Sequence, residues 1–400
     1  MINLDSNKKY LLACSFGPDS MALFDMLEKS RINFSVAHVN YNLRPESSNE
    51  TRDLLTYCKS KNIEIFIEEN DVKIKKNVEE KCREIRYEFF KEIYHKCGFD
   101  ALLIAHNQDD HIETYLMQQK RKNLVLFYGI SCKTSLFSMN VIRPLLGFKK
   151  SSLQSYCDEN SVPYCIDLSN LGDDFLRNQI RHNIVEKLSN NERNEILKEI
   201  DDKNSHLKSV LNKVAAFNSC NVLDLLKVEN EVLPYLLNKL ARNFNDDIEI
   251  SGRLCNEIKK ALLSDKPNVV VKLKKDFAFL KEYESFKFDY LEPVSYEFVV
   301  NFGDVIDNEY LFFDTNLNLE KRNLSQKDFP LTISNPKNGD EVRIKDYKVQ
   351  IRRLFIDWKM PLSLRDRWPI IRNNKNEIVY VPRYQKDFKK ENSNEFFVKI

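Results

Sequence analysis

The chain has 400 residues, of which 42% are hydrophobic and 30% charged, and its formal net charge is only +2. That length is too great for one ordinary core and predicts two or three domains. A balance this close to neutral does not mark the whole chain as a nucleic-acid binder, and no apolar run approaches the length that crosses a bilayer.

The N-terminus and the cysteines indicate the compartment. Residues 1–9 are polar and contain no apolar signal region. The nine cysteines stand singly, without a Cys-x-x-Cys pair. An odd number of cysteines without metal-ligand spacing predicts reduced thiols in a cytosol. We therefore expect a cytoplasmic protein that does not bind a membrane.

The first half of the chain alternates short apolar runs with helical patterns. We expect strands at residues 9–15, 34–40, 63–69 and 101–106, and helices at residues 20–29, 48–61 and 77–97. This alternation predicts an α/β fold, with a parallel sheet covered by helices on both faces. Ligands bind at the carboxyl ends of such strands, where polar loops follow the first and fourth strands.

The second half changes character twice. Two helical patterns occupy residues 151–188, residues 190–266 are helical with mixed charges, and alternation typical of strands begins after Pro267. We expect boundaries near residues 190 and 290. The predicted parts are an α/β N-terminal domain (1–190), a mainly helical middle domain (191–290) and a small α+β C-terminal domain (291–400).

The loop after the first strand reads Ser-Phe-Gly-Pro-Asp-Ser over residues 15–20. Backbone N–H groups and a helix N-terminus there suit a phosphate, although an ordinary strand-to-helix turn is the alternative. No Gly-Lys-Ser/Thr follows, so this is not a Walker loop. The segment resembles the PP-loop of the ATP pyrophosphatase superfamily, Ser-Gly-Gly-x-Asp-Ser. Phe16 replaces a glycine, and we expect its ring to turn away from the phosphates.

The loop after the fourth strand reads His-Asn-Gln-Asp-Asp-His-Ile-Glu-Thr over residues 106–114. Adjacent carboxylates at a strand end suit Mg²⁺ beside phosphates. Acidic residues at a helix N-terminus are the alternative, because they also favour the helix dipole. A zinc site fits poorly, since His106 and His111 have no thiolate partners nearby in sequence.

Taken together, these motifs resemble the tRNA(Ile)-lysidine synthetases, a PP-loop family. The family's His-Val-Asn-His-Gly-Leu-Arg is similar to residues 38–44, and its second motif is similar to residues 106–114. Further similar segments are residues 83–90, 142–146, 167–170 and 177–182 and, towards the C-terminus, 338–340, 351–361 and 365–369. The resemblance implies a PP-loop (adenine nucleotide alpha hydrolase-like) catalytic domain and a tRNA-binding C-terminal domain.

The resemblance also implies a reaction. ATP, L-lysine and the wobble cytidine of a tRNA(Ile) with a CAU anticodon would give lysidine, AMP and diphosphate, which switches decoding from AUG to AUA. The cytosine O2 attacks the α-phosphate of ATP, and the lysine ε-amine then displaces AMP at C2. Mg²⁺ is the expected metal. The oligomeric state is left open, a homodimer included.

Candidate site residues follow from the loops and the resemblance. The catalytic candidates are Asp19, Asp109, Asp110, Arg177 and Arg181, with Asp19 and Asp109 as the expected Mg²⁺ ligands. Asp19 would hold either the metal or the lysine amine, and Asp109 or Asp110 would orient the amine or the metal. The ATP-binding candidates are Ser15, Phe16, Gly17, Pro18, Asp19, Ser20, His38 and His106. The tRNA-binding candidates are Arg44, Arg83, Arg86, Lys120, Arg121, Arg143, Arg352, Arg353, Lys359 and Arg365. Residues 343–372 carry nine Lys or Arg against three Asp, a local excess that suits RNA.

Three other functions have weaker support in the sequence than lysidine synthesis. A tRNA thiolase of the same superfamily would generally need a reactive cysteine pair or an iron–sulfur cluster, and the absent Cys-x-x-Cys disfavours it. A catalytically silent tRNA-binding protein is conceivable because Phe16 alters the phosphate loop. An amidotransferase-coupled synthetase lacks support, because no glutaminase domain is visible in the sequence.

Overall fold

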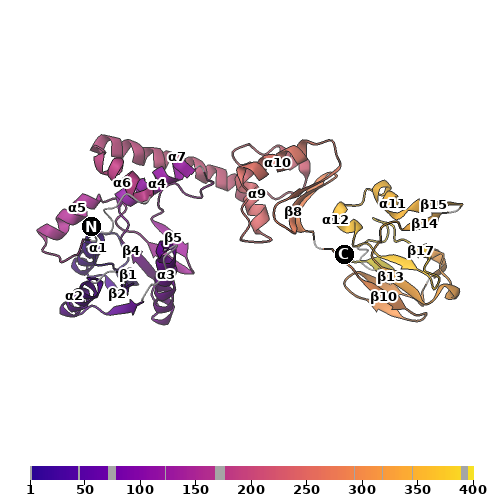
Figure 1. The fold of residues 1–400 in the computed structure, drawn as a ribbon, viewed down its shortest axis with the longest axis horizontal. Helices are drawn as coiled ribbons and strands as arrows, with labels where there is room; N and C mark the ends of the chain where they lie inside the picture. The colour runs from indigo at the N-terminus through magenta and orange to yellow at the C-terminus, as the bar shows by residue number, and fades with distance from the viewer. Residues whose placement is uncertain are drawn as a thin grey trace. The chain divides into compact units, whose positions relative to one another are not determined.

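The computed structural model describes residues 2–43, 46–70, 78–121, 123–166, 176–291, 293–317, 319–344, 346–388 and 395–400. Two compact units, Met1–Ser209 and Val210–Ile400, make up the chain. Figure 1 shows the elements of each. The three-domain division near residues 190 and 290 stays a prediction. Arg44 and the motif at residues 167–170 lie outside the described residues.

The first unit is built on a six-stranded sheet with the order β3-β2-β1-β4-β6-β5. Its strands are β1 (Lys9–Ala13), β2 (Asn33–Asn40), β3 (Ile65–Glu69), β4 (Ala101–Ile104), β5 (Lys133–Leu136) and β6 (Met139–Ile142). All pairings are parallel except that of the edge strand β5 with β6. The predicted α/β class and the four predicted strands are confirmed, whereas the β5–β6 hairpin was not predicted.

Helices cover both faces of this sheet. Leu12 and Leu103 face one hydrophobic cluster and Leu11 and Leu102 face another, as the two-residue period of a strand requires. The first cluster includes residues of α1 (Pro18–Lys29), α2 (Ser47–Ser60) and α5 (Lys150–Glu159), and the second those of α3 (Val78–Lys96). Each fully buried Leu or Phe stabilises the fold by about 1.5–3 kcal/mol. The helices predicted in this half are confirmed.

A smaller cluster holds the helices beside the sheet's carboxyl end. Ile112, Ile180 and Val185 form its centre. They come from α4 (Gln108–Arg121), α6 (Leu176–Asn183) and a 3₁₀-helix (Val185–Lys187), with α7 (Asn190–Ala216) packed against them. A reciprocal capping arrangement starts α4: Asp110 N–H donates to Asn107 Oδ1 and Asn107 N–H donates to Asp110 Oδ2, both at 3.0 Å.

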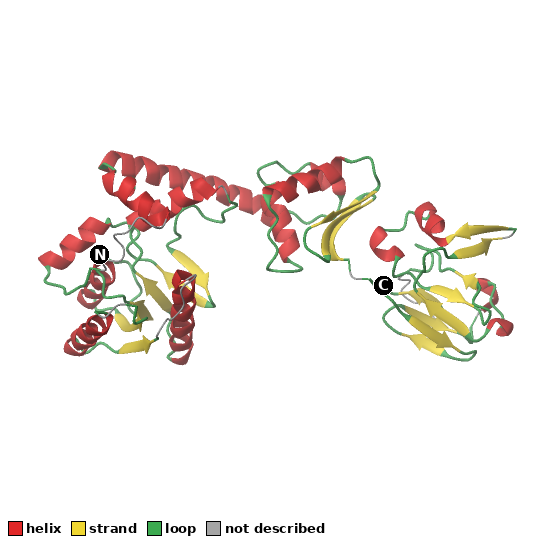
Figure 2. Ribbon diagram, in the orientation of Figure 1, coloured by secondary structure: helices red, strands yellow, loops and turns green. Residues whose placement is uncertain are grey.

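The second unit has two hydrophobic clusters. One joins the end of α7, α8 (Val222–Leu226), α9 (Leu233–Arg242) and α10 (Gly252–Leu263) to a sheet of β7 (Asn268–Lys272), β8 (Phe277–Glu282) and β9 (Ser285–Tyr290). The helical pattern predicted before Pro267 and the strands predicted after it are confirmed. Figure 2 shows this change from helices to strands.

The other cluster contains Trp368, Phe313 and Ile333 and belongs to an α+β part. The sheets have the orders β10-β13-β16-β17, β11-β12-β18 and β14-β15. The strands are β10 (Glu297–Val300), β11 (Val305–Asp307), β12 (Leu311–Asp314), β13 (Leu331–Ser334), β14 (Glu341–Ile344), β15 (Tyr347–Gln350), β16 (Ile370–Arg372), β17 (Ile378–Tyr380) and β18 (Phe396–Val398). The helices are α11 (Ile351–Asp357), α12 (Leu362–Arg365) and two 3₁₀-helices (Leu319–Arg322 and Gln326–Asp328).

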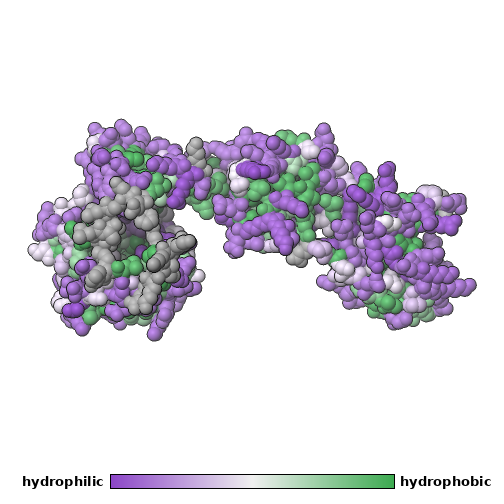
Figure 3. All heavy atoms as spheres, in the orientation of Figure 1, coloured by the Kyte–Doolittle hydropathy of each residue, from purple (hydrophilic) through white to green (hydrophobic). Residues whose placement is uncertain are grey.

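The surface is mainly polar. Figure 3 shows hydrophilic residues over most of the visible face of each unit, with hydrophobic residues exposed over the part that holds α10 and β8. Among the residues with a described structure, no helix combines the length and apolar character needed to cross a bilayer.

Candidate functional site

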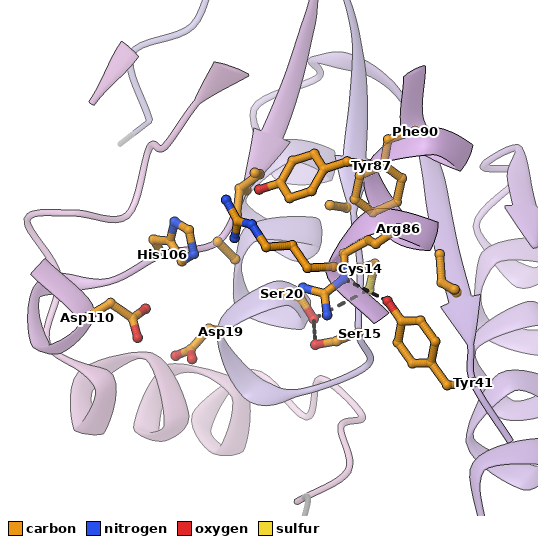
Figure 4. Close-up of a pocket in the computed structure, with 15 residues that line it drawn as sticks. Cys14, Ser15, Asp19, Ser20, Tyr41, Arg86, Tyr87, Phe90, His106 and Asp110 are labelled. Atoms are coloured by element: carbon orange, nitrogen blue, oxygen red, sulfur yellow. Dashed lines mark hydrogen bonds between the residues drawn. The ribbon is translucent and has the colours of Figure 1, made fainter. Parts of the chain in front are cut away.

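A pocket of about 290 Å³ opens where β1 and β4 end. These two strands are neighbours at the point where the strand order reverses, which is where ligands bind in open α/β sheets. Figure 4 shows Ser15, Asp19 and Ser20 from the loop and helix after β1 on the same pocket as His106 and Asp110 from the loop and helix after β4. The structure thus brings together the two loops singled out in the sequence.

The phosphate loop keeps its shape despite Phe16. The φ angle of Phe16 is 63°, in the left-handed region that a glycine adopts without strain. Its ring is only 3% exposed and belongs to the core beneath the sheet, so the expectation that it turns away is confirmed. The Ser20 hydroxyl donates to the Gly17 carbonyl at 2.9 Å, and α1 begins at Pro18. The loop therefore presents the positive end of a helix to an anion.

Asp19 has a buried oxygen without a partner. Its Oδ1 accepts no hydrogen bond, and burial, followed by the charge of Asp110, raises the pKa of Asp19 to about 6. Two carboxylates facing each other in low-dielectric surroundings favour a cation between them. Within the described residues no three His, Cys, Asp or Glu side chains form a metal-binding group. A Mg²⁺ ion therefore fits Asp19 only with phosphate oxygens and water as its other ligands.

Asp109 and Asp110 point in different directions. Asp110 lines the pocket, whereas Asp109 faces the neighbouring helices and is only 7% exposed. The Lys150 N–H donates to Asp109 Oδ2 at 2.8 Å, and the Arg193 guanidinium pairs with Asp109 Oδ1. Because Asp109 does not line the pocket and is buried against Arg193, it is poorly placed as the predicted Mg²⁺ ligand. The geometry favours a positioning role.

Glu113 is a site residue that the sequence analysis missed. It is fully buried and pairs with Arg177 Nε at 2.8 Å and Arg181 Nε at 2.6 Å. Arg177 also donates to Asp110 Oδ1 at 2.7 Å. The two predicted catalytic arginines are thus held against the carboxylates of α4. The three-residue spacing of Asp110 and Glu113, which places them on one helix face, was the available signal.

The two predicted ATP-binding histidines differ. His38 does not line the pocket: its ring nitrogens contact the Cys14 carbonyl at 2.9 Å and Thr51 Oγ1 at 3.0 Å, and burial lowers its pKa. It therefore holds the end of β1. His106 lines the pocket, and burial lowers its pKa to about 4. Because Arg143 Nε donates to His106 Nδ1 at 3.1 Å, the neutral ring carries its proton on Nε2.

Three predicted tRNA-binding arginines lie around the pocket. Arg83 and Arg86 of α3 line its wall, where Arg83 lies over the Tyr87 ring at 4.8 Å and Arg86 Nε donates to the Tyr41 hydroxyl at 2.8 Å. They are therefore placed for substrates in the pocket. Arg143 is only 7% exposed and also donates to the Ser131 carbonyl, so a direct tRNA contact from it is not favoured.

The remaining predicted tRNA-binding residues lie away from the pocket. Lys120 and Arg121 are both exposed at the end of α4. In the second unit, Arg352, Arg353 and Lys359 are exposed and Arg365 is half-buried. The Arg365 guanidinium donates to the Met360 carbonyl at 3.0 and 2.9 Å and to the Tyr283 hydroxyl at 3.1 Å. Arg352 and Arg365 line a cavity of about 490 Å³.

Comparisons with known proteins cover both units. Family models match over residues 1–188 (PP-loop domain) and 331–396 (TilS substrate C-terminal domain). A tRNA(Ile)-lysidine synthase of Mycoplasma mycoides is 30% identical over 400 residues, which is 95% of this chain and 98% of that protein. Another, of Ureaplasma parvum, is 42% identical over 199 residues, 48% of this chain and 59% of that protein. Among solved structures, a U34-tRNA thiolase of Methanococcus maripaludis has a TM-score of 0.44 and 18% identity, covering 51% of this chain and 74% of that chain.

Proposed function

The chain belongs to the tRNA(Ile)-lysidine synthase family, and we propose on that premise that it uses ATP to join L-lysine to C2 of the wobble cytidine in a tRNA(Ile) with a CAU anticodon. The products are lysidine, AMP and diphosphate. The observation that best supports the proposal is the unpartnered Asp19 oxygen opposite Asp110, directly beside a phosphate loop. That arrangement suits a substrate cation next to a nucleotide.

The first step activates the base. The cytosine O2 attacks the α-phosphate of ATP, and the bond to diphosphate breaks. The Ser15 and Ser20 hydroxyls and the N-terminus of α1 hold the leaving diphosphate. Asp19 Oδ1 would hold Mg²⁺ together with phosphate oxygens, and the ion supplies charge neutralisation at the leaving group. His106 donates its Nε2–H to an oxygen in the pocket without adding charge.

The second step delivers lysine. The ε-ammonium group binds between Asp19 and Asp110, where burial and the charge of Asp110 raise the pKa of Asp19. Only the neutral amine attacks, so a carboxylate that lines the pocket, Asp19 or Asp110, accepts the ammonium proton. The amine nitrogen then bonds to C2 of the cytosine, and the C2–O bond to AMP breaks.

Sulfur transfer is the main rival. Cys14 is the one cysteine among the described residues that line the pocket, and burial raises the pKa of its thiol. A buried thiol is a poor nucleophile, because the thiolate is the reactive form. All nine cysteines are free, and the sequence contains no Cys-x-x-Cys pair. These features favour lysine as the nucleophile and a cytosolic location.

The decisive assay supplies ATP, lysine and a tRNA(Ile) transcript with a CAU anticodon. We expect AMP and diphosphate to appear only when all three are present, and nuclease digestion of the tRNA to give lysidine. ADP and phosphate as products would contradict the assignment of the phosphate loop. A sulfur-containing nucleoside would replace lysidine synthesis with the thiolase function. Light scattering of the same preparation tests the homodimer that the sequence left open.

A further inference from the structure

Side chains of two helices hold the loop that follows α4. Three consecutive N–H groups, those of Tyr128, Gly129 and Ile130, donate to Asn204 Oδ1, Gln118 Oε1 and His111 Nδ1, each at 2.8 Å. The Gln118 and Asn204 amides in turn donate to the carbonyls of residues 127 and 128, at 3.1 and 3.0 Å. Five such bonds to helices α4 and α7 fix the backbone of a segment that belongs to no helix or strand.

His111 is part of the second motif, yet it has no place in the proposed reaction. Its ring packs against Gly129 so closely that a Cβ at that glycine would lie 2.5 Å from His111 Cε1. The φ angle of Gly129 is +71°, which a side chain would also strain. The histidine and the glycine therefore form one anchor, and the function of His111 is to set the position of this loop.

The anchored loop turns apolar side chains outwards. Leu124, Leu126 and Phe127 are 38%, 62% and 39% exposed. The adjacent Tyr128 points inwards, because its ring contacts Tyr115 edge-on at 6.1 Å and lies 5.7 Å from the Lys203 ammonium. Holding apolar groups in water on a fixed backbone gives the folded protein no stability of its own, so this loop is a candidate binding surface.

We propose that Leu126 and Phe127 form a stacking platform for an unpaired nucleotide of the substrate tRNA, outside the reacting base. The inference rests on the proposed function. Charge selects RNA as the occupant, since residues 120–133 contain four Lys or Arg and no Asp or Glu. Aromatic side chains beside cations are the usual receptors for splayed-out bases.

The length of α4 fits this assignment. Asp110 and Gln118, whose side chain donates to the carbonyl of residue 127, stand eight residues apart on α4, so roughly 12 Å of helix axis separates them at 1.5 Å per residue. That is the span of about three to four stacked nucleotides at 3.4 Å each. A tRNA whose wobble base enters the pocket therefore has other nucleotides of the anticodon arm within reach of the platform.

The test measures binding of the full-length protein to a fluorescent tRNA(Ile) transcript over a series of salt concentrations. Phe127→Ala should weaken binding about tenfold with an unchanged salt dependence, because stacking releases no counterions. Phe127→Tyr should restore it. Lys120→Gln should instead lower the slope of log K against log salt by about one. Gly129→Ala should weaken binding as Phe127→Ala does, since it displaces the loop.

The matched control is Leu223→Ser, because Leu223 and Leu126 are both 62% exposed. Leu126→Ser should weaken binding and Leu223→Ser should not. Unchanged tRNA affinity in Phe127→Ala overturns the platform. The platform is also overturned if Phe127→Ala loses affinity for the full tRNA but keeps its affinity for an isolated anticodon stem-loop. If the wild type makes lysidine while Phe127→Ala binds normally, only this inference fails. If the wild type makes none while the platform variants lose RNA affinity, the proposed function fails and the platform stands.

Discussion

Charged side chains are concentrated in two regions with opposite surroundings. One is the pocket at the ends of β1 and β4, and the other is the basic segment of residues 343–372. In the pocket, Glu113 is fully buried between two guanidinium groups and Asp19 keeps an unpartnered oxygen. In the basic segment, Arg352 is exposed, and Arg353 pairs with Asp357, one helix turn away, at 3.4 Å. Buried charges interact strongly, whereas exposed pairs contribute about 0–1 kcal/mol.

This difference has a consequence for function. The charges of the pocket form one network, in which Asp110 and Glu113 share Arg177 and Arg181, so the loss of one charge leaves a buried partner uncompensated. If the basic segment binds RNA as proposed, its exposed cations act through their sum, and each is expected to contribute a small and similar share of the affinity. Substitutions should therefore affect turnover in the pocket and salt-dependent affinity in the basic segment.

The largest effect is expected at Asp19. Asp19→Ala removes the carboxylate that would hold a cation beside the phosphates, and release of AMP and diphosphate should fall by on the order of 10³ or more. The matched control is Asp25→Asn on the same helix, since Asp25 contacts Lys29 at 2.7 Å and Tyr156 at 2.6 Å, outside the pocket. Asp25→Asn should lower stability and keep turnover. Normal AMP release by a folded Asp19→Ala variant would contradict the role of the pocket's buried charges in turnover.

Arg193→Met should have the next largest effect, because it leaves Asp109 charged and buried. Breaking such a pair costs about 3–5 kcal/mol of stability. It should also lower kcat by roughly ten- to a hundredfold with KM for ATP unchanged, since α4 also carries Asp110. The double variant Asp109→Asn/Arg193→Met should be less impaired than the sum of the two single changes. Full additivity would mean that Arg193 does not act through Asp109.

The Asp19→Asn variant tests how the buried charge of Asp19 affects stability, separately from its effect on activity. The pKa of Asp19 is raised from 3.8 to about 6, so the native state binds the proton more tightly than the unfolded state does. The charged form of Asp19 therefore lowers the free energy of unfolding. This destabilisation grows as the pH rises from 3.8 to 6 and is complete above that range. Asp19→Asn should stabilise the substrate-free protein by on the order of 1–3 kcal/mol at pH 8 and by little at pH 4. Urea unfolding at both pH values tests this; equal effects would refute it.

The smallest effect per residue is expected in the basic segment. Reversing Arg352 and Arg353 to Glu should weaken tRNA binding and reduce the slope of log K against log salt by about one for each lost phosphate contact. ATP affinity should hardly change. Arg253→Glu is the control, because Arg253 of α10 is 89% exposed and lies outside the basic segment. A tRNA affinity that is the same in all variants would make the segment structural.

The same contrast explains what the sequence predicted and what it did not. The four strands, the phosphate loop and Asp19 follow from local patterns, because apolar runs and loop residues report on their own neighbourhood. The partner of Asp109 could not be predicted, since Arg193 is 84 positions away and belongs to no motif. Nor could the inward orientation of Arg143, because burial depends on packing between distant segments. The strands β5 and β6 have four residues each, too few for a clear period.

The central claim is that the carboxylates opposite the phosphate loop deliver a lysine amine to an adenylated cytidine. The most direct measurement follows radiolabelled lysine into tRNA with the wild type and Asp110→Asn. The account predicts label in the anticodon base of tRNA(Ile) with a CAU anticodon, none in methionine tRNA with the same anticodon, and a loss of about a hundredfold in the variant. Label at the tRNA 3′ end, or equal incorporation by the variant, would contradict it.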